Sequence, residues 1–193
     1  MNYFTHALPH LDRPYFVAGT ALPDWLSVVN RKVRLRPKLL EPHDTRDQTM
    51  TAELVAGTLR HFDDDDWFHR TRGFAEVSAE VGLLFRRGLA GSDGFRCGFL
   101  GHIVTEMLLD AVLISRYPAK YDVYCSILPE VDAQGVAQQV EEIAGKPIPQ
   151  LAEFIGLFAR ERILNAYVHD TGLLRRLNQV LSRVKLTPLP PMA

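Results

Sequence analysis

Cysteine is scarce in this chain, and its scarcity excludes two classes of protein. The two cysteines, Cys97 and Cys125, are far apart and do not form a Cys-x-x-Cys motif. They cannot build a disulfide framework or a cysteine-rich structural zinc site, and they fit a reducing compartment. Net charge is also nearly absent, since 22 basic and 23 acidic residues leave a formal charge of -1. No overall field therefore points to nucleic acid or to an anionic membrane.

Long apolar runs are missing as well. The opening residues, MNYFTHALPHLDRP, lack the basic start and the apolar run of a signal peptide. No uninterrupted apolar stretch approaches the roughly 20 residues that a membrane span needs. We therefore expect a cytoplasmic protein without a transmembrane segment.

Strand signals are weak because few segments alternate apolar and polar residues, whereas helical periodicity is common. The segments expected to be helical are 15–29, 49–71, 74–89, 95–117, 121–131, 133–145, 149–168 and 171–184. A chain of 193 residues usually forms one domain. The sequence therefore predicts an all-α fold, a single multi-helix domain over residues 1–193, with residues 186–193 as a flexible tail.

Proline and glycine set the expected helix boundaries. Pro23 should break or bend the first long helix, and Pro118 should end the helix over 95–117. Gly73 should separate the helices over 49–71 and 74–89. Trp25 and Trp67 are expected to lie in the core or in a pocket wall.

The segment HFDDDDWFH, residues 61–69, places four consecutive aspartates between two histidines. On an α-helix, residues four apart lie on one face with Cβ atoms roughly 6 Å apart, so His61, Asp65 and His69 form one stripe. The remaining aspartates should point into solvent; they are Asp63, Asp64 and Asp66.

A second predicted helix repeats this pattern. In LGHIVTEMLLD, residues 100–110, His102 and Glu106 are four apart and Asp110 extends the row. The rest of this helix is strongly apolar, and buried ionisable groups are costly unless they are paired, hydrogen-bonded or bound to metal. Either a histidine–glutamate hydrogen bond in the core or a cation facing these side chains explains the pattern.

Two such stripes in one small chain favour a metal site. Histidine and carboxylate stripes that face each other in helix bundles build dinuclear sites, and these ligands suit zinc, manganese or iron. Two ions roughly 3.5–4 Å apart can activate a water and hold the oxygens of a phosphoester. Near the N-terminus, His6 and Asp24 add two candidates. The candidate metal ligands are therefore His6, Asp24, His61, Asp65, His69, His102 and Glu106.

The opening MNYFTH, Asp24 and the segment VAGTLRHFDDD together resemble bacterial acyl carrier protein phosphodiesterase. That family opens with a similar MNYLAH segment, has an aspartate in a Gly-Asn-Leu-Leu-Ala-Asp setting and carries a His-x-x-x-Asp motif. The matching positions are His6, Asp24, His61 and Asp65. The resemblance implies a phosphodiesterase whose substrate is a protein with a phosphopantetheine arm. The family lacks a clear equivalent of Glu106.

A second set of motifs resembles the zinc-dependent phospholipase C group, which shares its helical architecture with single-strand-specific fungal nucleases. The group combines a Thr-His near the start, a Pro-Asp, a Phe-His and an LGxxxHxxxD helix. The residues that echo these motifs are Thr5-His6, Pro23-Asp24, Phe68-His69, Leu100-Gly101, His102 and Glu106. Here His102 follows the glycine directly instead of four residues after it, and Glu106 replaces the usual aspartate. The two resemblances cover roughly the first 110 residues and imply a helical metal-dependent phosphoesterase.

The sequence thus predicts a metal-dependent hydrolase of phosphoesters. Asp65 and Glu106 are the candidate catalytic carboxylates, because desolvation raises the pKa of a carboxylate and suits it as a general base. Asp65 is also the best candidate for a bridging ligand, since it lies in the middle of its stripe. Arg70 and Arg72 are candidates for binding the substrate phosphate, with ordinary surface arginines near a helix end as the alternative.

The expected cofactor is a divalent metal, with zinc ranked before manganese and iron. The expected partner is a phosphoester substrate, with a phosphopantetheinyl protein among the candidates and no specific signal for nucleic acid. Two other interpretations stay open. One is a non-catalytic helical protein with a structural metal or a buried polar network. The other is a redox di-iron bundle, which ranks last because such proteins use Glu-x-x-His motifs at spacing three.

Overall fold

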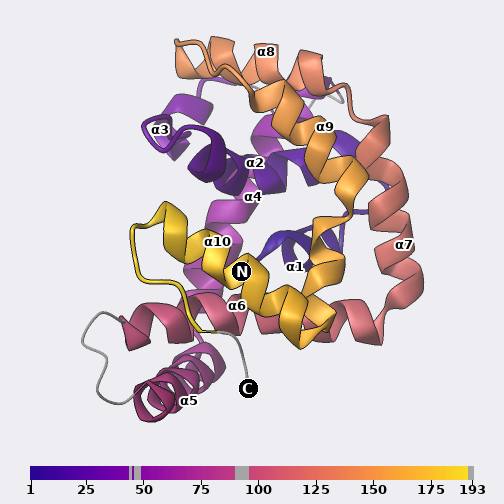
Figure 1. Cartoon of the computed structure of the whole chain (residues 1–193). Helices are drawn as coiled ribbons and strands as arrows, with labels where there is room; N and C mark the ends of the chain where they lie inside the picture. Colours follow the sequence, from indigo (N-terminus) through magenta and orange to yellow (C-terminus); the bar gives the residue numbers. More distant parts are fainter. Residues whose placement is uncertain (44, 46–48, 90–95, 191–193) are drawn as a thin grey trace. The chain divides into compact units, whose positions relative to one another are not determined.

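The computed structural model describes residues 1–43, 45, 49–89 and 96–190, and every regular element in these ranges is helical. The all-α prediction is therefore confirmed. The elements, of which the α-helices are labelled in Figure 1, are α1 (Tyr3–Ala7), α2 (Pro14–Val29), α3 (Pro37–Leu40), α4 (Met50–His69), α5 (Arg72–Gly88), α6 (Cys97–Arg116), α7 (Pro118–Ile127), η1 (Leu128–Glu130), α8 (Ala133–Ala144), α9 (Leu151–Glu161), η2 (Ile163–Val168) and α10 (Asp170–Arg183).

Contacts along the chain divide it into two compact units. The first unit comprises Met1–Asn2, Asp65–Arg116 and Leu164–Ala193, and the second comprises Tyr3–Asp64 and Tyr117–Ile163. Helix α4 contributes to both, because its residues up to Asp64 belong to the second unit and the rest belong to the first. The single-domain organisation over residues 1–193 stays a prediction.

Aromatic side chains from α1, α2, α7 and α9 build the core of the second unit. Phe4 packs edge-on against Tyr121 and Tyr124, with ring centroids 5.3 and 5.6 Å apart. Trp25 packs in the same way on Phe158 at 5.4 Å. All five rings are buried, and burying rings of this size is a major source of stability. This core fixes α1 and α2, the helices that carry His6 and Asp24.

Helices α2 and α4 touch backbone to backbone within the second unit. A Cβ atom at Gly57 would lie 2.1 Å from the carbonyl oxygen of Phe16 and 3.0 Å from Cα of Gly19. Only a residue without a Cβ atom allows so close an approach. The crossing brings the α4 side chains that follow Gly57 against the backbone of α2.

Helix α2 continues through Pro23, so it is not broken there. A proline inside a helix leaves the carbonyl four residues earlier without its amide donor, and here that carbonyl belongs to Gly19. The hydroxyl of Thr58 on α4 lies 3.1 Å from this oxygen and 2.8 Å from the carbonyl oxygen of Leu54, so its proton is shared. The hydroxyl of Thr58 on α4 thus replaces part of the hydrogen bonding that Pro23 removes from the Gly19 carbonyl.

Helices α5 and α6 form the closest helix pair of the first unit (Figure 1). A Cβ atom at Gly101 would lie 2.3 Å from the carbonyl oxygen of Ser78, so this glycine sets the distance between the helices. His102 follows Gly101 directly. The packing of α5 on α6 therefore fixes where this imidazole lies.

The boundary between α4 and α5 differs from the prediction. Helix α4 ends at His69 and α5 begins at Arg72, so Gly73 lies in the first turn of α5 instead of separating the helices. Thr71 ends the turn, because its side-chain oxygen accepts a hydrogen bond from the Phe74 amide at 3.2 Å. A side-chain cap of this kind satisfies an amide that has no partner in the first helical turn.

Two further expectations need correction. The helix predicted over 149–168 is divided into α9 and η2 at Arg162, whose backbone is left-handed with φ of 42°. Trp67 is 65% exposed, so its predicted place in the core or a pocket wall is wrong, whereas Trp25 is fully buried as predicted.

Helix α6 is the one helix in the described ranges that is long and apolar enough to cross a membrane, judged by length and composition alone. Core helices pass the same test, and the side chain of Asp110 on this helix is fully buried. The absence of a transmembrane segment stays a prediction.

The segment after α10 is held to that helix by Asn178. Its Nδ2 donates to the carbonyl oxygen of Leu189 at 3.0 Å, and the amide of Leu189 donates to its Oδ1 at 2.7 Å. This anchor lies inside the tail expected to be flexible, of which residues 191–193 are outside the described ranges.

Candidate metal-binding clusters

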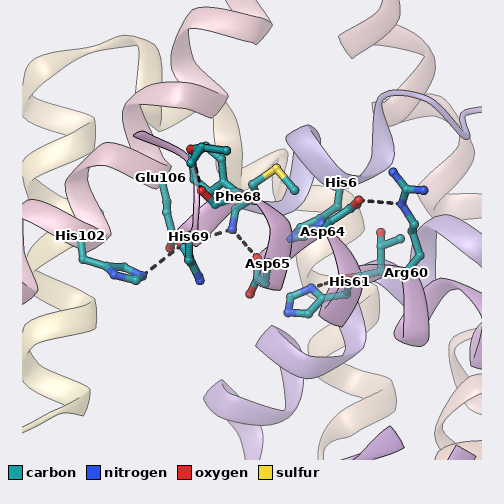
Figure 2. A network of polar contacts seen from close by, with 12 residues as sticks. His6, Arg60, His61, Asp64, Asp65, Phe68, His69, His102 and Glu106 are labelled. Atoms are coloured by element: carbon teal, nitrogen blue, oxygen red, sulfur yellow. Dashed lines mark hydrogen bonds and ion pairs between the residues drawn. The ribbon is translucent and has the colours of Figure 1, made fainter. Parts of the chain in front are cut away.

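Two imidazoles and a carboxylate meet in the first unit, as Figure 2 shows. His69 is the last residue of α4, and its Nε2 lies 2.8 Å from Oε1 of Glu106 on α6. Nε2 of His102, one turn before Glu106, lies 3.2 Å from the same oxygen. Because a carboxylate oxygen only accepts, each imidazole presents an N–H to it. These three residues are called the triad below.

The turn between α4 and α5 positions the two imidazoles of the triad. The ring centroid of Phe74 lies 4.8 Å from that of His69 and 4.9 Å from that of His102. The two imidazole centroids are 4.7 Å apart. Phe74 is placed by the Thr71 cap, so a local backbone motif holds the aromatic wall against the triad.

A positive charge lies between the two predicted catalytic carboxylates. The N-terminal ammonium of Met1 contacts Oδ1 of Asp65 and lies 3.2 Å from Oε1 of Glu106. Burial lowers the pKa of this amino group, but attraction to Glu106 and Asp65 outweighs burial and raises the pKa above its ordinary value of 8.0. Asp65 and Glu106 therefore hold one cation together within the first unit.

Glu106 is ionised at neutral pH. Burial raises the pKa of its carboxyl group, but hydrogen bonds from His102 and His69 and the nearby ammonium bring the pKa below its ordinary value of 4.5. The raised pKa expected of a general base is therefore absent at Glu106. An ionised, hydrogen-bonded carboxylate is suited to ligating a cation.

His6 and His61 form a second cluster, in the second unit, called the histidine pair below. Their rings stack with centroids 4.4 Å apart and an interplanar angle of 25°. Each offers a ring nitrogen, and these two nitrogens lie within 4.8 Å of one another. Both side chains are buried.

The hydrogen bond of His61 fixes which of its nitrogens carries the proton. Nδ1 lies 2.8 Å from the carbonyl oxygen of Thr20, which only accepts, so Nδ1 carries the hydrogen. In the neutral ring the lone pair then belongs to Nε2. Ligating histidines are usually oriented in this way, with the other ring nitrogen donating to a carbonyl or a carboxylate. The close crossing at Gly57 brings Thr20 within reach.

Asp64 lies inside the second unit, so the prediction that it is solvated is wrong. It is 8% exposed; its Oδ1 accepts from Nε of Arg60 at 2.6 Å and its Oδ2 lies 3.2 Å from Nδ1 of His6. Asp63 and Asp66 are exposed, as predicted. Spacing four from His61 selected Asp65, but a residue at spacing three lies on the same side of a helix. Applying both spacings would have found Asp64.

The remaining predicted site residues lie outside both clusters. Asp24 is half-buried on α2, one turn after Thr20, and belongs to neither cluster of the described residues. Arg70 and Arg72 are exposed and pair with Asp66 and Glu76, each at 2.6 Å and one turn away. Their role in binding phosphate stays a prediction.

The triad has the donors and the exposure of a catalytic metal site. Its three ligand atoms lie within 4.8 Å of one another, and two histidines with one glutamate are a ligand set of catalytic zinc. The side chains of His69, His102 and Glu106 are 32%, 39% and 13% exposed, so water reaches them. The residues therefore fit the divalent metal expected from the sequence, and a bound ion would take the place of the two Nε2 hydrogens that point to Glu106.

Comparison of the chain with protein family models, curated proteins and solved structures finds no match. The resemblance to acyl carrier protein phosphodiesterase and to the phospholipase C group therefore rests on the quoted motifs alone. The function has to be inferred from the geometry of the triad and of the histidine pair.

Proposed function

We propose that this protein is a metal-dependent hydrolase of phosphoesters and that the triad is its principal metal site. The observation that carries the proposal is the meeting of His69, His102 and Glu106 at a position that water reaches. A structural metal site is closed by four protein ligands, whereas a catalytic site keeps a position open. Three protein ligands with exposed faces have the character of an open site.

The side chains divide into ligands and a proton acceptor. The triad, in the first unit, supplies two imidazoles and one ionised carboxylate, whereas the histidine pair, in the second unit, is a separate candidate set of two imidazoles. Asp65 follows His61 by one turn on α4, and we assign to its carboxylate the role of accepting the proton of the attacking water. A bound divalent ion, with zinc as first choice and manganese or iron as alternatives, would activate that water for attack on phosphorus.

The substrate class follows from the motifs rather than from a pocket. Both families that the sequence resembles act on phosphoesters, one on a phosphopantetheinyl protein and the other on phospholipids. We propose a phosphodiester as the substrate, with the phosphopantetheinyl protein as one candidate. Arg70 and Arg72 would each have to exchange a carboxylate partner for phosphate in order to take part.

The metal content of the purified protein tests the proposal. Inductively coupled plasma mass spectrometry should find zinc, manganese or iron in the wild type and less of it in His102→Ala. His169→Ala is the matched control, because His169 is exposed and its side chain makes no capping hydrogen bond. The affinity tag belongs at the C-terminal end, since the amino group of Met1 contacts Asp65. A wild type that takes up none of the three ions would contradict the proposal.

Turnover of chromogenic phosphomonoesters and phosphodiesters is the second measurement. The metal-loaded wild type and His169→Ala should hydrolyse at least one of these substrates, whereas Asp65→Ala should remain folded and lose turnover. Loss of a general base typically lowers a rate by about 10²–10⁴-fold. Equal turnover by Asp65→Ala and wild type would remove Asp65 from the proposed mechanism.

A second function is favoured by one observation. The two Nε2 atoms and the Oε1 atom of the triad satisfy one another by hydrogen bonds without a metal. A non-catalytic helical protein with a polar network would show the same contacts. In that protein, or in one with a structural metal, His102→Ala would lower the melting temperature, and no phosphoester would be turned over.

A further inference from the structure

We propose that Asp64 is a positioning residue that directs Nε2 of His6 toward a metal ion. This inference rests on the proposed function, because it concerns how one half of the histidine pair becomes a ligand. The sequence predicts that Asp64 points into solvent. Its carboxylate instead lies 3.2 Å from Nδ1 of His6, which is only 1% exposed.

The direction of the hydrogen bond follows from the charge on Asp64. Nε of Arg60, one turn earlier on α4, lies 2.6 Å from Oδ1 of Asp64, and the two groups form an ion pair. An ionised carboxylate only accepts hydrogen bonds. Nδ1 of His6 must therefore carry the hydrogen that lies between the two groups.

The position of this hydrogen decides which nitrogen can bind a metal. A neutral imidazole has one N–H and one lone pair, and in water the hydrogen resides mainly on Nε2. With the hydrogen held on Nδ1, the lone pair of His6 is on Nε2. The carbonyl of Thr20 has the same effect on His61. Both members of the pair are thus prepared as Nε2 ligands, one by a carboxylate and one by the backbone.

The spacing along α4 also fixes where Asp64 lies relative to the histidine pair. Asp64 lies three residues after His61 on α4, and His61 stacks on His6 at 4.4 Å. One helix therefore provides both a histidine of the pair and the carboxylate that orients the other histidine. Outer partners of this kind typically contribute about 10–100-fold to metal affinity.

The tautomer of His6 can be measured directly. In ¹⁵N-labelled wild type without metal, long-range ¹H–¹⁵N correlation spectra should show the hydrogen of His6 on Nδ1; the signal is assigned by its loss in His6→Gln. Asp64→Asn should move the hydrogen to Nε2. Asp63→Asn, the exposed neighbour with the same chemical change, should leave it on Nδ1. A wild-type hydrogen on Nε2 would overturn the inference, and this result is read from the wild-type spectrum, with only the assignment taken from His6→Gln.

Zinc titration then tests the consequence for binding. Zinc affinity should fall by about 10–100-fold in Asp64→Asn, stay unchanged in Asp63→Asn and recover in part in Asp64→Glu. Circular dichroism confirms that each protein is folded. A wild type that binds zinc no more tightly than Asp64→Asn would overturn the positioning role and leave the proposed function standing. A wild type that binds no zinc at all would overturn both, and the two failures are therefore distinguishable.

Discussion

Replacing Gly57 with alanine should destabilise the protein and disturb the histidine pair at the same time. The added Cβ atom would lie 2.1 Å from the carbonyl oxygen of Phe16, and such contacts below 3.0 Å essentially never occur. Helices α2 and α4 must therefore separate by about 0.9 Å, the difference between these two distances. Overpacking of this kind costs about 1–3 kcal/mol, against about 1 kcal/mol gained from the better helix propensity of alanine.

Two hydrogen bonds cross the same contact and would be stretched. Nδ1 of His61 lies 2.8 Å from the carbonyl oxygen of Thr20, and the hydroxyl of Thr58 lies 3.1 Å from that of Gly19. A shift of about 0.9 Å takes both beyond hydrogen-bond range, at about 1 kcal/mol each. The expected loss in the free energy of unfolding is therefore about 2–4 kcal/mol.

Urea denaturation followed by circular dichroism measures this loss. Gly73→Ala is the control, because a Cβ atom there meets nothing within 4 Å. It should leave the free energy of unfolding unchanged or raise it by up to about 1 kcal/mol. Zinc affinity should fall in Gly57→Ala alone, since His61 loses the acceptor that fixes its tautomer. A Gly57→Ala protein as stable as the wild type would refute the close crossing of α2 and α4.

Three further predictions test other parts of the structure. The folded-state pKa of Glu106 lies below 4.5, so its ionised form stabilises the protein above that pH, and this stability is lost as pH falls through the lowered pKa. The midpoint of urea denaturation should therefore fall less steeply with decreasing pH in Glu106→Gln than in the wild type. Asn178→Ala should release the segment around Leu189, seen as faster limited proteolysis after α10, and an unchanged cleavage rate would contradict the anchor. Trp25→Ala should cost about 3–5 kcal/mol in urea denaturation, whereas Trp67→Ala should cost less than about 1 kcal/mol because that ring is 65% exposed.

The helical class and the members of the triad could be predicted from spacing. Histidine and carboxylate four apart on an apolar helix identify His102 and Glu106, because a helix brings such residues onto one face. The pattern on α4 predicted a shared face but not which cluster each histidine joins. His61 and His69 share one stripe, yet His61 pairs with His6 while His69 joins the triad.

What could not be predicted depends on contacts between elements far apart in the sequence. Pro23 is a strong helix breaker by itself, and only the hydroxyl of Thr58 on another helix explains why α2 continues. Asp64 is indistinguishable from its three neighbours as a residue type. Helical spacing places it near His61 and Arg60 on α4, but its contact with His6 on α1 depends on how the helices pack.

The path of the backbone limits how this protein can be dissected genetically. The chain changes unit after Asn2, Asp64, Arg116 and Ile163, so neither unit is one continuous stretch. A fragment that ends before α7 keeps every residue of the triad but loses the α7 and α9 rings packed on Phe4 and Trp25. Terminal deletions will therefore report on folding before they report on either cluster. Point substitutions, or circular permutation at a surface loop, are better suited to separating the role of each cluster from its effect on folding.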